Sequence, residues 1–318
     1  MDKITVLKDT NTNENATVLK CNSVDNENTT KVKCNSVDNE NTTNFKHNSV
    51  DNENTTNFKH NSVDNIVTVL KNERIANDIY QMLLQHTAQV DIKGGQFIHI
   101  KLSAEFSLRR PFCICNFDKN AKTITITYQI VGKGTAYLAT VKAGEKLSAL
   151  FPLGNGFTIE DTQQKVLLIS GGIGNAVLPA ITAEYPNKDF YTFMGFANAG
   201  KVCLTAEMQK VSKQVVISTD DGSYGFKGFV TQAVAQQFDA IKPDVVLCCG
   251  PEIMFKSVAK TLQNKNTPIY VSLERRMGCG VGACLVCACK VKTADGAKYL
   301  HACIDGPVFD LREVCLDE

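Results

Sequence analysis

Four cysteines lie within eleven residues in the stretch MGCGVGACLVCACK, residues 277–290. The spacing Cys279-x4-Cys284-x2-Cys287, with Cys303 following after fifteen intervening residues, matches the ligand order of plant-type ferredoxins. Thiolates bind iron, and a glycine-rich loop can wrap closely and donate N–H groups to the sulfur atoms. The sequence therefore predicts an iron–sulfur site whose ligands are Cys279, Cys284, Cys287 and Cys303.

Zinc is the alternative metal for the same thiols. A zinc site would favour two C-x2-C knuckles, and this stretch contains one. Cys289 competes with Cys287 for the third ligand position, but its two-residue offset would place its side chain farther along an alternating strand, so Cys287 is preferred. Eight other side chains are expected to be ordinary, the thiols as small buried hydrophobes and the imidazoles as core or surface groups: Cys113, Cys115, Cys203, Cys248, Cys315, His86, His99 and His301.

A glycine-rich turn, residues 171–174, follows the apolar run KVLLIS and precedes a helical pattern. Glycine there lets the backbone approach a pyrophosphate at the start of a helix. The fingerprint is incomplete, because Val177 occupies its last position, and a plain tight turn is the alternative. Two further loops, residues 220–223 and 249–251, also follow predicted strands. Because such loops converge on one crevice, we predict a dinucleotide site there.

A third motif, Arg109-Arg110-Pro111-Phe112-Cys113, leads into a predicted strand. The run of residues 128–135 ends another strand and opens a helix at Gly134-Thr135. A guanidinium and the first N–H groups of a helix both suit a phosphate. The residues alone leave open a solvated basic pair and a routine turn.

The motifs must be held in place by folded domains, and the sequence patterns around them divide the chain into four predicted parts. Residues 1–65 contain a 13-residue repeat such as CNSVDNENTTNFK, which is too polar to build a core and is predicted to be disordered. Residues 66–162 show period-two alternation, which predicts an antiparallel β-barrel. Residues 163–272 alternate strands and helices, which predicts a doubly wound parallel sheet. Residues 273–318 form the small cysteine-bearing domain.

Composition limits the partners. The net charge of +1 gives no overall field that would attract nucleic acid or an anionic membrane. The sequence has neither a run of about 18 apolar residues nor the apolar core of a signal peptide. We therefore expect a cytoplasmic protein whose thirteen cysteines stay reduced.

Taken together and in order, RRPFC, VGKGT, LGNGF, GGIG, DGSYGFKGFV, CGP and the cysteine tail resemble the electron-transfer subunits of type B, NAD-linked dihydroorotate dehydrogenases, within the ferredoxin reductase-like flavoproteins. The resemblance covers residues 66–318. It implies FAD at Arg110, Pro111, Phe112, Cys113, Tyr128, Gln129, Ile130, Gly134 and Thr135. It implies NAD near Gly172, Gly174, Asp220, Cys249, Gly250 and Pro251, and a 2Fe-2S cluster at Cys279, Cys284, Cys287 and Cys303. Cys113 departs from the family's usual serine, and the repeat matches nothing in the family.

The resemblance also implies a separate catalytic chain that oxidises dihydroorotate on its own FMN, in a heterotetramer with two copies of each chain. Electrons would pass through the cluster and FAD to NAD, in pyrimidine biosynthesis, and this chain would contribute no catalytic residue to dihydroorotate oxidation. The alternatives are a related subunit of a sulfur reductase, a hydrogenase or a ferredoxin–NADP oxidoreductase and, more remotely, a zinc-stabilised binding module. The loop of residues 195–201 lacks an arginine for a 2′-phosphate, which favours NAD over NADP.

Overall fold

A computed structural model describes residues 20–26, 29–35, 63–294 and 296–316. The chain divides into two compact units, Met1–Thr55 and Thr56–Glu318. Within the first unit, β1 (Lys20–Asn26) and β2 (Thr29–Asn35) pair as an antiparallel hairpin. Residues 63–65, which were also predicted to be disordered, belong to a strand. Apart from these three strands, residues 1–65 lie outside those described, and there disorder stays a prediction.

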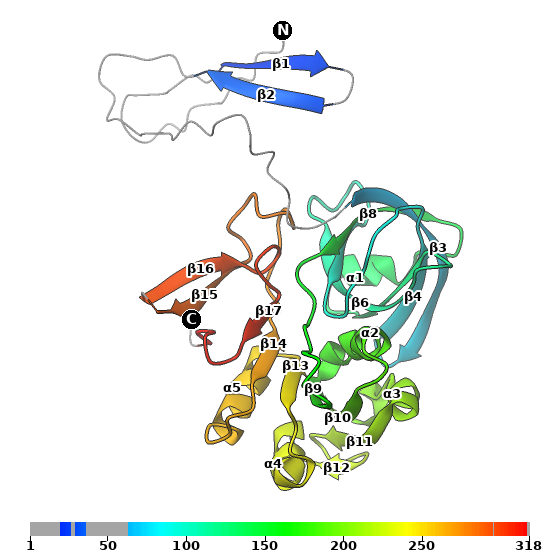
Figure 1. The fold of residues 1–318 in the computed structure, drawn as a ribbon. Helices are drawn as coiled ribbons and strands as arrows, with labels where there is room; N and C mark the ends of the chain where they lie inside the picture. The colour runs from blue at the N-terminus through cyan, green and yellow to red at the C-terminus, as the bar shows by residue number, and fades with distance from the viewer. Residues whose placement is uncertain (1–19, 27–28, 36–62, 295, 317–318) are drawn as a thin grey trace, which may run out of the picture. The chain divides into compact units, whose positions relative to one another are not determined.

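Six strands of the second unit close into an antiparallel barrel in the order β3-β4-β7-β6-β5-β8 (Figure 1). These strands are β3 (Val63–Ala76), β4 (Ile79–Gln85), β5 (Phe97–Lys101), β6 (Arg110–Asp118), β7 (Thr123–Gln129) and β8 (Lys146–Leu153), and the helix α1 (Lys133–Leu138) follows β7. The alternation that predicted them is visible in β7, where Ile124 and Ile126 are fully buried in the barrel core. The predicted antiparallel barrel is confirmed.

A seven-stranded sheet follows, in the order β12-β11-β10-β9-β13-β14-β17. The strands are β9 (Lys165–Gly171), β10 (Asp189–Phe196), β11 (Ser212–Thr219), β12 (Phe226–Lys227), β13 (Val245–Cys249), β14 (Ile269–Ser272) and β17 (Val308–Asp310). The helices are η1 (Gly172–Val177), α2 (Leu178–Glu184), η2 (Ala199–Lys201), α3 (Thr205–Val211), α4 (Val230–Ile241) and α5 (Glu252–Thr261). The pairs from β12 to β14 are parallel, as predicted, and β17 adds an antiparallel edge.

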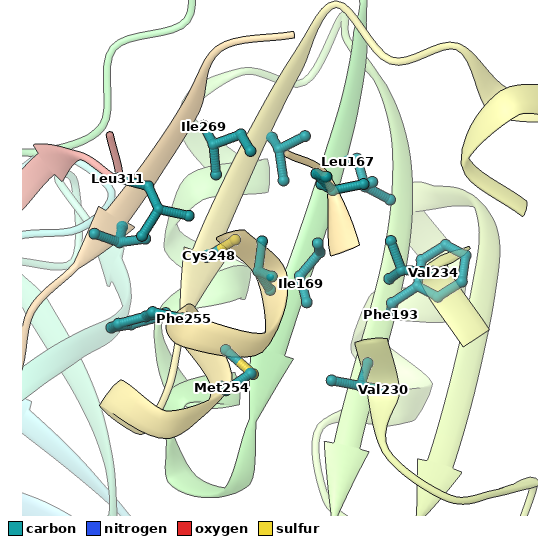
Figure 2. Close-up of a cluster of buried hydrophobic side chains, with 14 of the residues drawn as sticks. Leu167, Ile169, Phe193, Val230, Val234, Cys248, Met254, Phe255, Ile269 and Leu311 are labelled. Atoms are coloured by element: carbon teal, nitrogen blue, oxygen red, sulfur yellow. The ribbon is translucent and has the colours of Figure 1, made fainter. Parts of the chain in front are cut away.

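Both faces of this sheet are buried, which explains the continuous apolar run of β9. Leu167 and Ile169 point to one face and pack with the side chains of α4 and α5 (Figure 2). Val166 and Leu168 point to the other face and pack with residues of α2, α3 and the barrel. Strand residues alternate between faces, so a strand covered on both sides is apolar at nearly every position.

The cysteine-bearing tail is built onto this sheet. Its hairpin consists of β15 (Ala288–Thr293) and β16 (Gly296–His301). Val291 of the hairpin and Phe309 of β17 belong to the same hydrophobic core as α4 and α5. No helix in the part of the chain that the structure describes is long and apolar enough to cross a membrane.

Candidate functional site

The β15–β16 hairpin brings two of the predicted ligands together. Ala288 pairs with His301 across the hairpin, so Cys287 and Cys303, one just before it and one just after it, become neighbours. Their Sγ atoms are 3.4 Å apart. The fifteen residues between these cysteines in the sequence therefore form the hairpin that unites them.

Cys279 and Cys284 lie on the loop that precedes the hairpin, residues 277–287, which we call the cluster loop. The backbone N–H of Val281 donates to Cys279 Sγ at 3.4 Å, and that of Gly282 donates to Cys303 Sγ at 3.2 Å. Gly280 and Gly282 have φ values of 77° and 78°, a left-handed conformation that favours glycine. The loop thus folds around the thiols with N–H groups directed at sulfur, as the glycine-rich sequence predicted.

The thiols differ in acidity. Burial opposes ionisation of Cys279, but hydrogen bonds from the Val281 N–H and from Cys284 outweigh it and lower the pKa to about 7. Burial, and next the Cys287 thiol, raises the pKa of Cys303 to about 12. Among the described residues, no three His, Cys, Asp or Glu side chains are already arranged around one metal position. The four thiols and their N–H donors nevertheless have the chemistry that an iron–sulfur cluster requires.

The predicted flavin motif is assembled at the start of β6 and α1. A Cβ built on Gly134 would lie 3.2 Å from Arg110 Nε, so the guanidinium rests against the backbone of the short helix. Arg110 Nη1 also donates to the carbonyl of Leu108 at 2.8 Å. Thr135 Oγ1 accepts the backbone N–H of Val131 at 2.9 Å, which shapes the turn into the helix. Arg110, Gly134 and Thr135 are therefore brought together, as a phosphate site would require.

The remaining residues of the flavin prediction differ in exposure. The side chain of Tyr128 is buried in the barrel, where its hydroxyl donates to Asn72 Oδ1 at 2.9 Å. Tyr128 would therefore contact a ligand through its backbone rather than through its side chain. Gln129 and Ile130, at the end of β7, are partly exposed. In β6 Phe112 is buried, and Pro111 and Cys113 are partly exposed.

The predicted nucleotide loops meet at the switch point of the sheet. From β9 the chain proceeds to β10 on one side and later to β13 on the other, and ligands of such sheets bind where the order reverses. A Cβ on Gly174 would lie 2.4 Å from the carbonyl oxygen of Cys249, so the two loops touch. A Cβ on Gly172 would meet none of the described residues within 4 Å. Asp220 lies farther away, at the end of β11, and its pKa is raised by partial burial and by Asp221.

Glu274, which the sequence analysis did not select, influences one thiol of the flavin motif and one thiol of the nucleotide loop. Burial, followed by the charges of Glu274 and Cys115, raises the pKa of Cys113 to about 12. Burial and then Cys113 raise the pKa of Cys249 well above its usual value, and Glu274 contributes to the same shift. Desolvation by the surrounding protein also raises the pKa of Glu274. The Cys113 and Cys249 thiols therefore stay neutral, and each is influenced electrostatically by the carboxyl group of Glu274, which follows β14. Glu274 could have been selected from the sequence because it follows the last strand of the α/β pattern, where such sheets bind their ligands.

A second overlooked residue is His99, in β5. It is fully buried, and neither of its ring nitrogens has a hydrogen-bond partner in the described structure. Burial lowers its pKa to about 4, a shift that the backbone groups of Arg109 and Cys279 oppose. A Cβ on Gly280 would lie 2.6 Å from His99 Nδ1. His99 was expected to be an ordinary histidine, and it lies between the flavin motif and the cluster loop.

Comparisons with known proteins agree with this arrangement. A family model for the iron-sulfur cluster binding domain of dihydroorotate dehydrogenase B matches residues 274–315. The dihydroorotate dehydrogenase B (NAD(+)) electron transfer subunit of Streptococcus mutans is 40% identical over 256 residues, which cover 79% of this chain and 98% of that protein. The corresponding subunit of Clostridium acetobutylicum is 37% identical over 254 residues, covering 79% and 96%.

Solved structures show the same architecture. The structure of an NADH-dependent reduced ferredoxin-NADP oxidoreductase, a flavin-based electron-bifurcating enzyme, superposes with a TM-score of 0.70 at 29% identity, over 79% of this chain and 90% of that chain. The ferredoxin reductase in carbazole 1,9a-dioxygenase superposes with a TM-score of 0.59 at 20% identity, over 66% and 69%. The second likeness shows the fold alone.

Proposed function

Because the chain belongs to the family of electron transfer subunits of dihydroorotate dehydrogenase B, we propose that it passes electrons from the oxidation of dihydroorotate to NAD. It is an oxidoreductase subunit of pyrimidine biosynthesis, and its cofactors are FAD, a 2Fe-2S cluster and NAD. When bound, the cluster supplies one-electron transfer, and FAD links it to the two-electron exchange with the nicotinamide.

The residues of the chain bind and position these groups. Arg110 and the Gly134–Thr135 turn bind the FAD phosphates, with Pro111, Phe112, Cys113 and residues 128–130 along the rest of the cofactor. Gly172, Gly174 and residues 249–251 receive NAD at the switch point, with Asp220 at the far strand end. Cys279, Cys284, Cys287 and Cys303 bind the cluster. Cys113 lies in the flavin motif and Cys249, whose pKa it raises, lies in the nucleotide loop, and flavin and nicotinamide would contact these two motifs.

One observation supports this function above the others: the cluster loop packs against the flavin barrel within one compact unit. Met277, Cys287 and Cys303 share a hydrophobic cluster with Phe97 of β5 and Leu153 of β8. The β5 strand is paired directly with β6, which carries the flavin motif. A one-electron centre and a flavin held this close together can exchange electrons within the chain.

NAD is favoured over NADP by the loop after β10. The cation in this loop, Lys201, forms an ion pair with Asp78 at 3.0 Å. Lys201 is therefore directed toward the barrel, and its charge is paired with Asp78. An NADP site would instead need a cation that can bind the 2′-phosphate.

A catalytic partner subunit follows from the family. We propose that the partner contains FMN, that the complex holds two copies of each chain, and that it works in the cytoplasm. Two apolar residues of the cluster loop support docking at this point, because Leu285 and Val286 are 75% and 55% exposed between two of the predicted ligands. Exposed apolar side chains in a group are typical of protein interfaces.

The test is purification of the chain with its partner, followed by cofactor analysis and two assays. We expect about two iron atoms and one FAD per chain, dihydroorotate-dependent reduction of NAD, and NADH-dependent reduction of a dye. Stoichiometric zinc without iron would exclude the proposal. Cofactors in the expected amounts, with electron flow that depends on reduced ferredoxin and NADP rather than on dihydroorotate, would instead support the ferredoxin–NADP alternative that the 29% identical structure suggests.

A further inference from the structure

His99 occupies a position that connects the two predicted redox sites. In the barrel it lies opposite Pro111 of β6 on one side and Leu150 of β8 on the other. Pro111 belongs to the flavin motif. The carbonyl of His99 accepts a hydrogen bond from Arg109 Nη1 at 3.3 Å, which ties the same residue to the start of that motif.

The ring of His99 faces the cluster loop. Its Nδ1 atom lies so near Gly280 that a Cβ there would come within 2.6 Å. Gly280 has a left-handed φ of 77° and directly follows the predicted ligand Cys279. The loop backbone can approach the imidazole this closely because residue 280 has no side chain.

A buried imidazole without partners requires an explanation. His99 has no exposed surface, and both ring nitrogens lack hydrogen bonds to the residues that the structure describes. A polar group in this state costs stability unless something in the functional protein satisfies it. Two groups that could do so are the backbone of Arg109, in the flavin motif, and that of Cys279, in the cluster loop, both of which oppose the lowering of the His99 pKa.

We propose that His99 is a positioning residue for electron transfer, whose Nδ1–H donates a hydrogen bond to the cluster loop at Cys279 when the cluster is bound. The bond holds the loop against the flavin-binding strand. It also directs the positive end of the N–H dipole toward a centre that becomes more negative when it accepts an electron, and so stabilises the reduced form. Hydrogen bonds and local polarity are the means by which proteins tune such centres.

This inference rests on the proposed function, because it requires a cluster at Cys279. The experiment compares the full chain with His99→Leu, which removes the donor at similar volume, and with His99→Asn, which keeps an N–H donor. His86→Leu is the matched control. His86 is also a buried histidine of the barrel with an unpartnered Nδ1, but its ring packs against Phe151, with ring centroids 5.0 Å apart.

The readout is the cluster's midpoint potential, measured by a redox titration followed by absorption and electron paramagnetic resonance. For His99→Leu we expect about a tenfold shift of the one-electron equilibrium toward the oxidised cluster, which corresponds to a midpoint about 59 mV more negative. His99→Asn should stay near the wild-type value, and His86→Leu should leave it unchanged. FAD content should be equal in all four proteins.

An unchanged potential in His99→Leu would overturn the inference, as would an equal shift in His86→Leu or in His99→Asn. If His99→Leu loses the cluster, its midpoint potential cannot be measured, and the test then depends on His99→Asn. A retained cluster with near wild-type potential in His99→Asn then supports the inference, and loss of the cluster from both variants overturns it. A wild-type chain without iron would instead exclude the proposed function, so the two failures can be distinguished.

Discussion

The guanidinium of Arg110 lies against Gly134, so closely that a Cβ on Gly134 would come within 3.2 Å of Arg110 Nε and 3.0 Å of Leu102 Cδ1. Arg110 begins a barrel strand, and Gly134 belongs to the first turn of α1. Two residues that are distant in the sequence therefore share one proposed phosphate site. The site depends on the absence of a side chain at position 134.

Gly134→Ala should weaken FAD binding about tenfold, or about 1.4 kcal/mol, because the added methyl group displaces Arg110. Alanine is otherwise the better helix residue by roughly 1 kcal/mol, so folding should not suffer. FAD affinity can be measured by titrating the apoprotein while following flavin fluorescence. Gly132→Ala is the control, since a Cβ there would come within 4 Å of no atom in the part of the chain that the structure describes. Equal weakening in both variants would contradict the proposed role of the Arg110–Gly134 contact.

Cys287→Ser and Cys289→Ser should separate the third cluster ligand from its neighbour. Cys287 Sγ lies 3.4 Å from Cys303 Sγ, whereas the Cys289 thiol donates to the carbonyl of Leu300 at 3.3 Å. Cys287→Ser should therefore lose most of the approximately two iron atoms per chain, and Cys289→Ser should keep them. Iron and sulfide analysis, with the visible spectrum, gives the answer. The reverse result would assign the third ligand to Cys289.

Dihydroorotate-to-NAD activity should collapse in Cys287→Ser, while NADH-dependent dye reduction should largely persist. The flavin barrel and the nucleotide sheet have large hydrophobic cores of their own, so the flavin half of the chain can work without the cluster. Loss of the dye reaction as well would mean that the cluster loop is needed to form the flavin site.

The patterns that predicted the fold are local. Alternation in the strand of residues 123–129 and the unbroken apolar run of residues 165–171 report which faces of each strand are buried, and this information lies within a few neighbouring residues. The edge strand β17 has only three residues, Val308–Asp310, which is too few to show a period. Its pairing with β14 depends on contacts between distant segments, and the sequence analysis did not foresee it.

The same distinction applies to the site. The cysteine spacing predicted a ligand set, because metal-binding loops carry their ligands at characteristic short intervals. His99 and Glu274 gain their importance from three or more chain segments that meet only in the fold. A single buried histidine in an alternating strand looks like any other core residue, and a glutamate after a strand looks like a solvated one.

Glu274→Gln should change how stability depends on pH. Desolvation raises the pKa of Glu274 above its usual 4.5, so the folded protein binds this proton more tightly than the unfolded chain. The resulting stabilisation is full below the unfolded pKa and is lost as pH rises through the folded pKa. Glutamine carries no charge at any pH, so the variant should gain in melting temperature relative to wild type as pH rises above the usual pKa of 4.5. The side chain keeps much of its surface exposed, so we expect a small gain.

Melting temperatures must be compared at equal FAD and iron content, because Glu274 influences one thiol in each of the two proposed cofactor motifs. Glu105→Gln, which changes an exposed carboxylate of a barrel loop, is the control. A difference between wild type and Glu274→Gln that is the same at every pH would show that the carboxyl group is not desolvated.

Two deletions at the front of the chain should have opposite outcomes. A chain that starts at Thr56, the first residue of the second compact unit, should keep FAD, iron and NADH-dependent dye reduction, because the barrel's first strand begins at Val63.

A chain that starts at Val69 lacks Val63–Thr68, the residues that pair β3 with β8 and close the barrel. It also lacks Val67, which is fully buried in the barrel core. An open barrel exposes two strand edges and part of its core, so the second deletion should fail to bind FAD and should aggregate on purification. FAD content and gel filtration of both proteins check the pair. Loss of FAD from the chain that starts at Thr56 would show that the repeat-bearing segment contributes to the flavin site.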